Sequence, residues 1–281
     1  TMDTNKDRDC AFLARAALFP SRLHRDKTHD LELPALQALG KIRDVVMAKY
    51  PNAALSSVFP KHVLVVRSVT ANYGELQWNG QPDLKGASFD VLPNIFSVCC
   101  SDCDALNIPS ELNAFTRIVG EKSGQTGVKK EIVLCTDRLM KSDYSPEKSL
   151  DMSSLPRRSF QAVEEALAHE VTKIRDQFKF DCKDNTDDPS STCRGLALAE
   201  IRAAAAAECY YSKEGKSVRR GSGLPRGFSL LPASVQRSIL HRCINTVAMK
   251  STERKFGNGE GSKCVAEVFD SVINPYDGKQ E

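Results

Sequence analysis

The strongest hydrophobic pattern in the chain is a stripe of apolar residues that recurs at steps of three and four. Its members are Phe160, Val163, Leu167, Val171, Ile174 and Phe178. This spacing is typical of an amphipathic helix with one face in a core. At about 100° per residue, His169, Lys173 and Asp176 fall on the opposite side. The pattern therefore predicts a helix whose polar face meets either a cleft or solvent.

Shorter patterns predict further helices and a small sheet. Residues 131–135, Glu131 followed by four apolar residues, predict a short strand, and residues 62–79 predict a hairpin around Asn72-Tyr73-Gly74. Helices are expected at 10–19, 33–50, 196–209, 230–251 and 264–272, and loops at 80–95, 120–130, 180–191 and 213–226. Together these elements predict an α+β fold that is mainly helical.

Charge and hydropathy narrow the function classes. The chain has 281 residues, and 39 Lys and Arg against 36 Asp and Glu give a net charge of +3. That charge is too small to indicate nucleic-acid binding, so no nucleic-acid partner is expected. No window holds the roughly 20 apolar residues of a membrane span. The basic segment Lys213–Arg226 is interpreted as a solvated loop, with contact to acidic lipid headgroups as the alternative.

Cysteine is unusually frequent, with ten residues in the chain. Such density indicates either an oxidising compartment or metal binding, and the plain alternative is small buried thiols in a reducing compartment. Cys100-x-x-Cys103 has no second Cys-x-x-Cys to complete a zinc ribbon. The adjacent pair Cys99-Cys100 suits a disulfide framework better. Cys182 and Cys193 are candidates for a disulfide that closes the acidic loop between them.

The predicted central helix carries part of a zinc-protease motif. In His-Glu-x-x-His, two histidines one turn apart hold the metal and the glutamate activates its water. Here His169 and Glu170 are present, but Lys173 stands at the second histidine. An ammonium has no lone pair to give and repels a dication. The plain alternative is a surface helix with a solvated polar face.

Several short segments share their order with one protein family. They are Ile-Val-Leu-Cys at 132–135, His169-Glu170, Glu-Ile-Arg-Ala at 200–203, Cys209, Cys243-Ile244 and Val-Phe-Asp-Ser at 268–271. In this order the chain resembles the mitochondrial intermembrane-space metallopeptidase family that processes and helps assemble ATP synthase. The likeness covers roughly residues 95–277. It implies a zincin-like domain at 95–281, preceded by an extension at 1–94 used for docking.

The chain departs from this family at several positions, among them the zinc-binding ones. Lys173 replaces the second zinc-binding histidine, Ala199 replaces a serine, and Val272 replaces the cysteine after Phe-Asp-Ser. The family's histidine upstream of Glu200 has no counterpart. The vestigial positions are His169, Glu170, Lys173, Asp176 and Glu200. The resemblance therefore implies a pseudoenzyme with no catalytic residue, no metal and no cofactor.

The resemblance also implies a compartment and its disulfides. In the intermembrane space we expect at least two disulfides, drawn from nine candidates: Cys99, Cys100, Cys103, Cys135, Cys182, Cys193, Cys209, Cys243 and Cys264. Because Glu170 is three residues before Lys173, and Glu200 suits a carboxylate ligand position, we expect Lys173 to replace the dication as counter-charge.

Three functions follow from this reading. The first is a non-catalytic structural subunit or assembly factor of a mitochondrial inner-membrane complex, peripheral to the membrane, with ATP synthase subunits as the first partners. The second is an active, atypical zinc peptidase that uses His169, Glu200 and His241 as ligands and Glu170 as base. The third is a chaperone that binds clients along Ile132–Cys135, expected as an edge strand.

Overall fold

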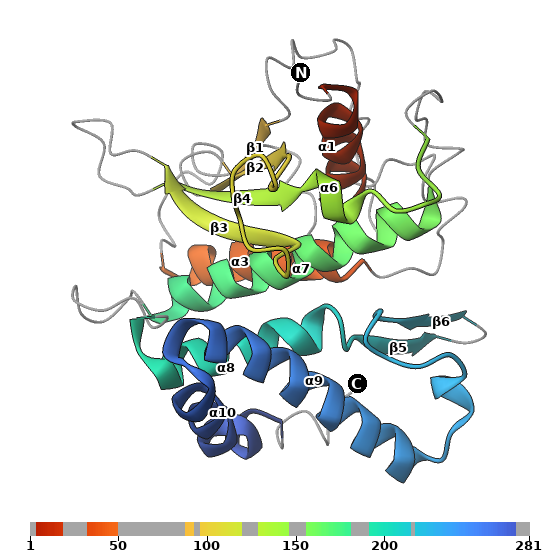
Figure 1. Ribbon diagram of the computed structural model, residues 1–281. Coiled ribbons are helices and arrows are strands. Elements are labelled where there is room, and N and C mark those ends of the chain that lie inside the picture. The colour runs from red at the N-terminus through yellow and green to blue at the C-terminus, as the bar shows by residue number, and fades with distance from the viewer. Residues whose placement is uncertain are drawn as a thin grey trace. The chain divides into compact units, whose positions relative to one another are not determined.

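The computed structural model describes residues 4–18, 33–49, 88–92, 96–119, 129–145, 156–180, 191–214 and 217–273. The chain forms two compact units, Thr1–Glu170 and Val171–Glu281. Helix α7 (Arg157–Phe180) contributes to both of them (Figure 1). The predicted boundary after residue 94 instead falls between two paired strands of the first unit. The predicted hairpin at 62–79 lies outside the described residues.

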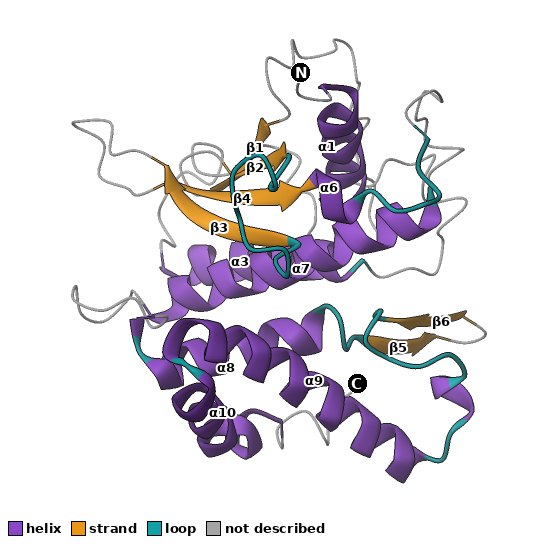
Figure 2. Cartoon of the chain, in the orientation of Figure 1, coloured by secondary structure: helices purple, strands orange, loops and turns teal. Residues whose placement is uncertain are grey.

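The first unit is built on a four-stranded sheet with the order β1-β2-β4-β3 (Figure 2). The strands are β1 (Ser88–Leu92), β2 (Phe96–Ser101), β3 (Ala114–Val119) and β4 (Lys129–Cys135). Strand β4 pairs parallel with β2 and antiparallel with β3. Its residues 131–135 are all buried. Burial on both faces explains why Ile132–Cys135 is apolar without alternation.

The position of β4 corrects the sequence prediction. Ile132–Cys135 was expected at the edge of the sheet, but β4 has a hydrogen-bonded neighbour on each side. The outer position beside it belongs to β3, which the sequence analysis did not identify as a strand. Thr116 and Arg117 make β3 half-polar, and its polarity hid the strand pattern. Strand β1 likewise lies within 80–95, where a loop was expected.

The N-terminal helices pack into the first unit. Helix α1 (Thr4–Leu18) contacts β2, and α3 (Pro34–Lys49) contacts α1. Leu13 and Leu18 of α1 and Ile42 of α3 are fully buried. The N-terminus of α3 is also fixed, because the backbone N–H of Ala35 donates to the buried Glu164 carboxylate at 3.1 Å. Residues expected to serve as a docking extension thus contribute to the core of this unit.

A single arginine organises the loop between β2 and β3. Arg138, in the one-turn helix α6 (Thr136–Leu139), has only 10% of its side chain exposed. Its guanidinium donates to the carbonyl oxygens of Ile108, Pro109 and Leu112 and to the Asp104 carboxylate. A guanidinium carries five donors in a fixed fork, so one side chain can hold several loop carbonyls at once.

The second unit is a three-helix assembly with a short hairpin. Helices α8 (Cys193–Ala206), α9 (Ala233–Phe256) and α10 (Asn258–Ile273) pack on one another. Their shared core includes Ala197, Ile201, Ala204, Ile244, Ala248 and Val265. Thr192 caps α8, because its Oγ1 accepts from the Gly195 N–H at 3.1 Å. Of the helices in the described segments, none combines the length and apolar content needed to cross a membrane.

The hairpin of the second unit corrects another prediction. Strands β5 (Tyr211–Glu214) and β6 (Ser217–Arg220) pair antiparallel, and they overlap the stretch 213–226 that was expected to be a loop. A 3-10 turn, η3 (Phe228–Leu230), follows and precedes α9. Each strand has only four residues, which is too short for an alternating pattern to stand out. In the sequence, a Gly-Lys dipeptide stands between Glu214 and Ser217, and a dipeptide that begins with glycine is a hairpin signal that was overlooked.

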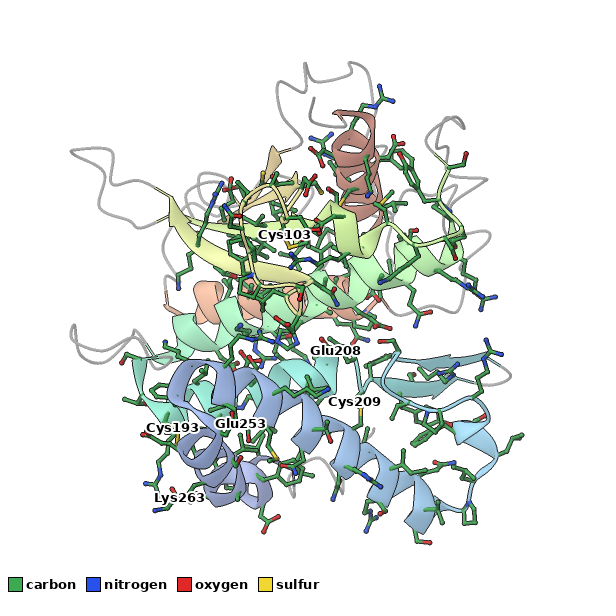
Figure 3. All side chains as sticks on the ribbon, in the orientation of Figure 1. Cys103, Cys193, Glu208, Cys209, Glu253 and Lys263 are labelled. Carbon is green, nitrogen blue, oxygen red and sulfur yellow. A yellow bond between two sulfur atoms is a disulfide. The ribbon has the colours of Figure 1, made fainter. Side chains whose placement is uncertain are left out.

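Three disulfides connect described cysteines, and they confirm the expectation of at least two. Cys103, which follows β2, joins Cys135 at the end of β4. Cys193 of α8 joins Cys264 of α10, and Cys209, after α8, joins Cys243 of α9. Figure 3 labels Cys103, Cys193 and Cys209, one member of each pair.

One part of the cysteine prediction was wrong, the pairing of Cys193 with Cys182. Cys193 bonds Cys264, so it does not staple the acidic loop to Cys182, which lies outside the described residues. Cys99 and Cys100 are thiols in the structure, as is Cys10.

Candidate functional site

Helix α7 forms where the apolar stripe predicted it. Val163, Leu167, Val171 and Ile174 are fully buried. The helix begins at a carboxylate, because Asp143 accepts from the backbone N–H groups of Arg158 at 2.6 Å and of Ser159 at 3.2 Å. A carboxylate at this point complements the positive end of the helix dipole. The helix therefore holds its polar residues in a fixed register.

Lys173 forms an ion pair with Glu200 of α8 inside the second unit. The Lys173 Nζ lies 3.0 Å from Glu200 Oε1, with 23% of the lysine side chain and 1% of the glutamate side chain exposed. A carboxylate this deeply buried needs a cation beside it, since desolvation of a lone charge is costly. Of the two carboxylates expected beside Lys173, which are Glu170 and Glu200, Glu200 forms this ion pair. The partner of the lysine comes from another helix.

A second ionic cluster lies on the same part of α7. Asp176 is buried and accepts from Arg175 Nε at 2.8 Å and Nη2 at 2.6 Å. Arg202 of α8 adds a third contact, with Nη1 3.2 Å from Asp176 Oδ2. Asp176 is therefore neutralised by two guanidinium groups. Lys173 and Asp176, three residues apart on α7, both take partners from α8.

His169 and Glu170 belong to the first unit. His169 is partly buried, and Glu170 is 3% exposed. Glu170 Oε2 accepts a hydrogen bond from Thr116 Oγ1 of β3 at 2.6 Å. A carboxylate that serves as a general base must reach the water it deprotonates. In this structure, Oε2 of Glu170 is instead occupied by the hydrogen bond from the Thr116 hydroxyl of β3.

The helix residues His169 and Lys173 do not fit a zinc site of the His-Glu-x-x-His type. A helix site needs two imidazole lone pairs one turn apart, and Lys173 supplies an ammonium with donors only. The carboxylate that resembles a third ligand, Glu200, lies against that ammonium. Within the described segments, no three His, Cys, Asp or Glu residues come together in an arrangement that could hold a metal ion.

His241, the ligand considered for an active enzyme, has a packing role within the second unit. Its ring lies edge-on to Phe269 of α10, with the ring centroids 5.9 Å apart. Such an edge-to-face contact between α9 and α10 is a common way to pack aromatic rings. This contact places the His241 ring of α9 against α10.

Sequence reasoning missed three residues of this region: Thr116, Arg175 and Arg202. Thr116 lies on the strand that was not recognised. Arg175 and Arg202 each stand close in sequence to a residue that was singled out, Asp176 and Glu200 respectively. The adjacent Arg-Asp dipeptide and the arginine two residues after Glu200 were visible signals, but only the packing of α8 on α7 within the second unit explains their pairing.

Comparison of the chain with protein-family models, with curated proteins and with solved structures returned no match.

Proposed function

We propose that this chain is a catalytically inactive, metallopeptidase-like subunit or assembly factor of a mitochondrial inner-membrane complex, with ATP synthase as the first candidate. One observation carries the proposal: the ammonium of Lys173 lies 3.0 Å from the Glu200 carboxylate, at the helix position where the resembling family holds its zinc. The lysine supplies the positive charge that the carboxylate would otherwise take from a metal. The polar face of α7 then stabilises the fold instead of catalysing a reaction.

Disulfides support the proposed compartment. Three cysteine pairs are bonded, and two of them lie in the second unit. One of these joins α8 to α10, and the other joins the segment after α8 to α9. Structural disulfides persist in oxidising compartments and are rare in the cytosol. A location in the intermembrane space, peripheral to the inner membrane, is consistent with these bonds.

The sheet topology weakens the chaperone alternative. That alternative had clients adding a strand along Ile132–Cys135, and β4 is already paired on both sides. Strand addition needs unpaired backbone groups at a sheet edge. A non-catalytic role in a stable complex is therefore the better-supported function.

Native co-migration tests this function. An epitope-tagged chain, isolated from mitochondria in mild detergent, is expected to migrate with one inner-membrane complex, in a fixed ratio to its subunits by quantitative mass spectrometry. The matched control is Glu170→Gln, which should leave the ratio and the processing of complex subunits unchanged. A chain that runs alone would contradict the proposal, and so would one whose Glu170→Gln variant accumulates unprocessed subunits.

A further inference from the structure

Two cysteines outside the three disulfides lie in direct sulfur contact. The Sγ atoms of Cys10 and Cys100 are 2.7 Å apart. Non-bonded heavy atoms prefer separations of about 3.5–4.0 Å, whereas the sulfurs of a disulfide are about 2.05 Å apart. The contact is therefore much closer than ordinary packing requires. Cys10 is 0% exposed and Cys100 is 3% exposed, so solvent does not separate them.

The fold holds these sulfurs together through other contacts. Cys10 lies on α1 and Cys100 on β2, and the two elements pack on each other. Helix α1 is anchored just before Cys10 in sequence: Thr136 Oγ1 donates to Asp7 at 2.8 Å, and Tyr144 Oη donates to Asp9 at 2.8 Å. These anchors position Cys10 independently of any bond between the sulfurs.

Strand geometry selects Cys100 over its neighbour. Successive side chains of a strand point to opposite faces, so Cys99 and Cys100 cannot both meet α1. Cys100 contacts Cys10, while the Cys99 thiol is half-buried and lies 3.7 Å from the Cys100 carbonyl oxygen. One thiol of the adjacent pair therefore has a bonding partner within reach.

We propose that Cys10 and Cys100 form a fourth disulfide, which joins helix α1 to strand β2 in the oxidised protein. Formation removes one hydrogen from each thiol and creates one S–S bond. The two protons and two electrons pass to a disulfide oxidant such as oxidised glutathione, which leaves as two thiols. The bond spans 90 residues of sequence and connects the predicted extension to the sheet.

The surroundings of the pair determine when it forms. Burial raises the pKa of the Cys100 thiol well above its ordinary value, and the hydrogen bond to Cys10 raises it further. A buried protonated thiol exchanges slowly, because the thiolate is the reactive species. The disulfide therefore forms during oxidative folding, and once formed it resists mild reductants.

Peptide mapping without reduction tests this inference. The chain is purified without reductant, blocked with N-ethylmaleimide in denaturant and digested with trypsin. We expect the peptide Asp9–Arg15 to be linked to Gly86–Arg117, which is also joined to Glu131–Arg138 through the Cys103–Cys135 bond. Cys99 should carry the maleimide. Maleimide on both Cys10 and Cys100, in chains with the other three bonds intact, would overturn the inference.

Variants separate the two neighbouring thiols. Cys99→Ser is expected to keep the linked peptides, and Cys100→Ser to lose them. Because a disulfide that closes a long loop restricts the unfolded chain, Cys100→Ser should lower the melting temperature by about 10 °C relative to Cys99→Ser. If Cys100→Ser fails to fold, the wild-type digest still decides the question. The test does not depend on the proposed function, because it requires neither a complex nor the absence of zinc.

Discussion

Replacing Lys173 with alanine is expected to lower the free energy of unfolding by about 3 kcal/mol. The variant leaves the Glu200 carboxylate, which is 1% exposed, without the ammonium that lies 3.0 Å from it. Breaking a buried ion pair typically costs about 3–5 kcal/mol, and the 23% exposure of the lysine favours the lower end. Denaturant unfolding of both proteins, followed by circular dichroism, measures the difference.

A surface pair in the same unit provides the matched control. Arg194 and Glu267 also meet at 2.8 Å, but 69% of the arginine side chain is exposed. Arg194→Ala should cost under about 1 kcal/mol, as exposed ion pairs do. The double variant Lys173→Met/Glu200→Gln should recover most of the loss, because it removes both charges. Equal small losses for Lys173→Ala and Arg194→Ala would show that Lys173 is an ordinary surface residue.

Replacing Gly261 with alanine is expected to destabilise the second unit by about 2–3 kcal/mol. An added Cβ would lie 2.6 Å from the backbone N and Cα of Glu253 and 2.9 Å from the carbonyl carbon of Thr252. Backbone atoms of α9 cannot move aside as a flexible side chain could, so α10 must shift away from α9. Overpacking of this kind typically costs about 1–3 kcal/mol. Thermal unfolding reports the loss.

Gly259 in the same helix is the control for this substitution. A Cβ at Gly259 meets nothing within 4 Å. Gly259→Ala should therefore be neutral or stabilise by up to about 1 kcal/mol, because alanine restricts the unfolded chain and favours the helix. Opposite signs for the two alanines would establish that the α9–α10 contact, labelled at Glu253 in Figure 3, is the cause. Equal effects would contradict that explanation.

The parts of the fold that sequence predicted are those with a local cause. The stripe from Phe160 to Phe178 determines the register of α7, and helix α3 begins and ends close to its prolines as expected. The internal position of β4 was not predictable, because it depends on pairing with β3, whose polar residues obscure the strand pattern. Cysteine content predicted disulfides, but their partners depend on packing between segments far apart in sequence.

In the candidate site too, local spacing was predictable and contacts between distant segments were not. Helical spacing alone relates Lys173 to residues three or four positions away, so it suggested Glu170 as a partner. The observed partner in the second unit, Glu200, lies 27 residues farther along and is brought close by the packing of α8. Only the resemblance to the metallopeptidase family pointed to Glu200. Neither helical spacing nor the family resemblance pointed to the two arginines that contact Asp176.

Zinc content per chain is the most direct test of the central claim that Lys173 replaces the metal. The protein is purified without chelator, dialysed against metal-free buffer and analysed by elemental mass spectrometry. The ion pair between Lys173 and Glu200 predicts zinc near zero per chain, and Lys173→His is the matched variant that restores the two-histidine spacing. One zinc per wild-type chain would contradict the claim and favour an active peptidase with Glu170 as its base.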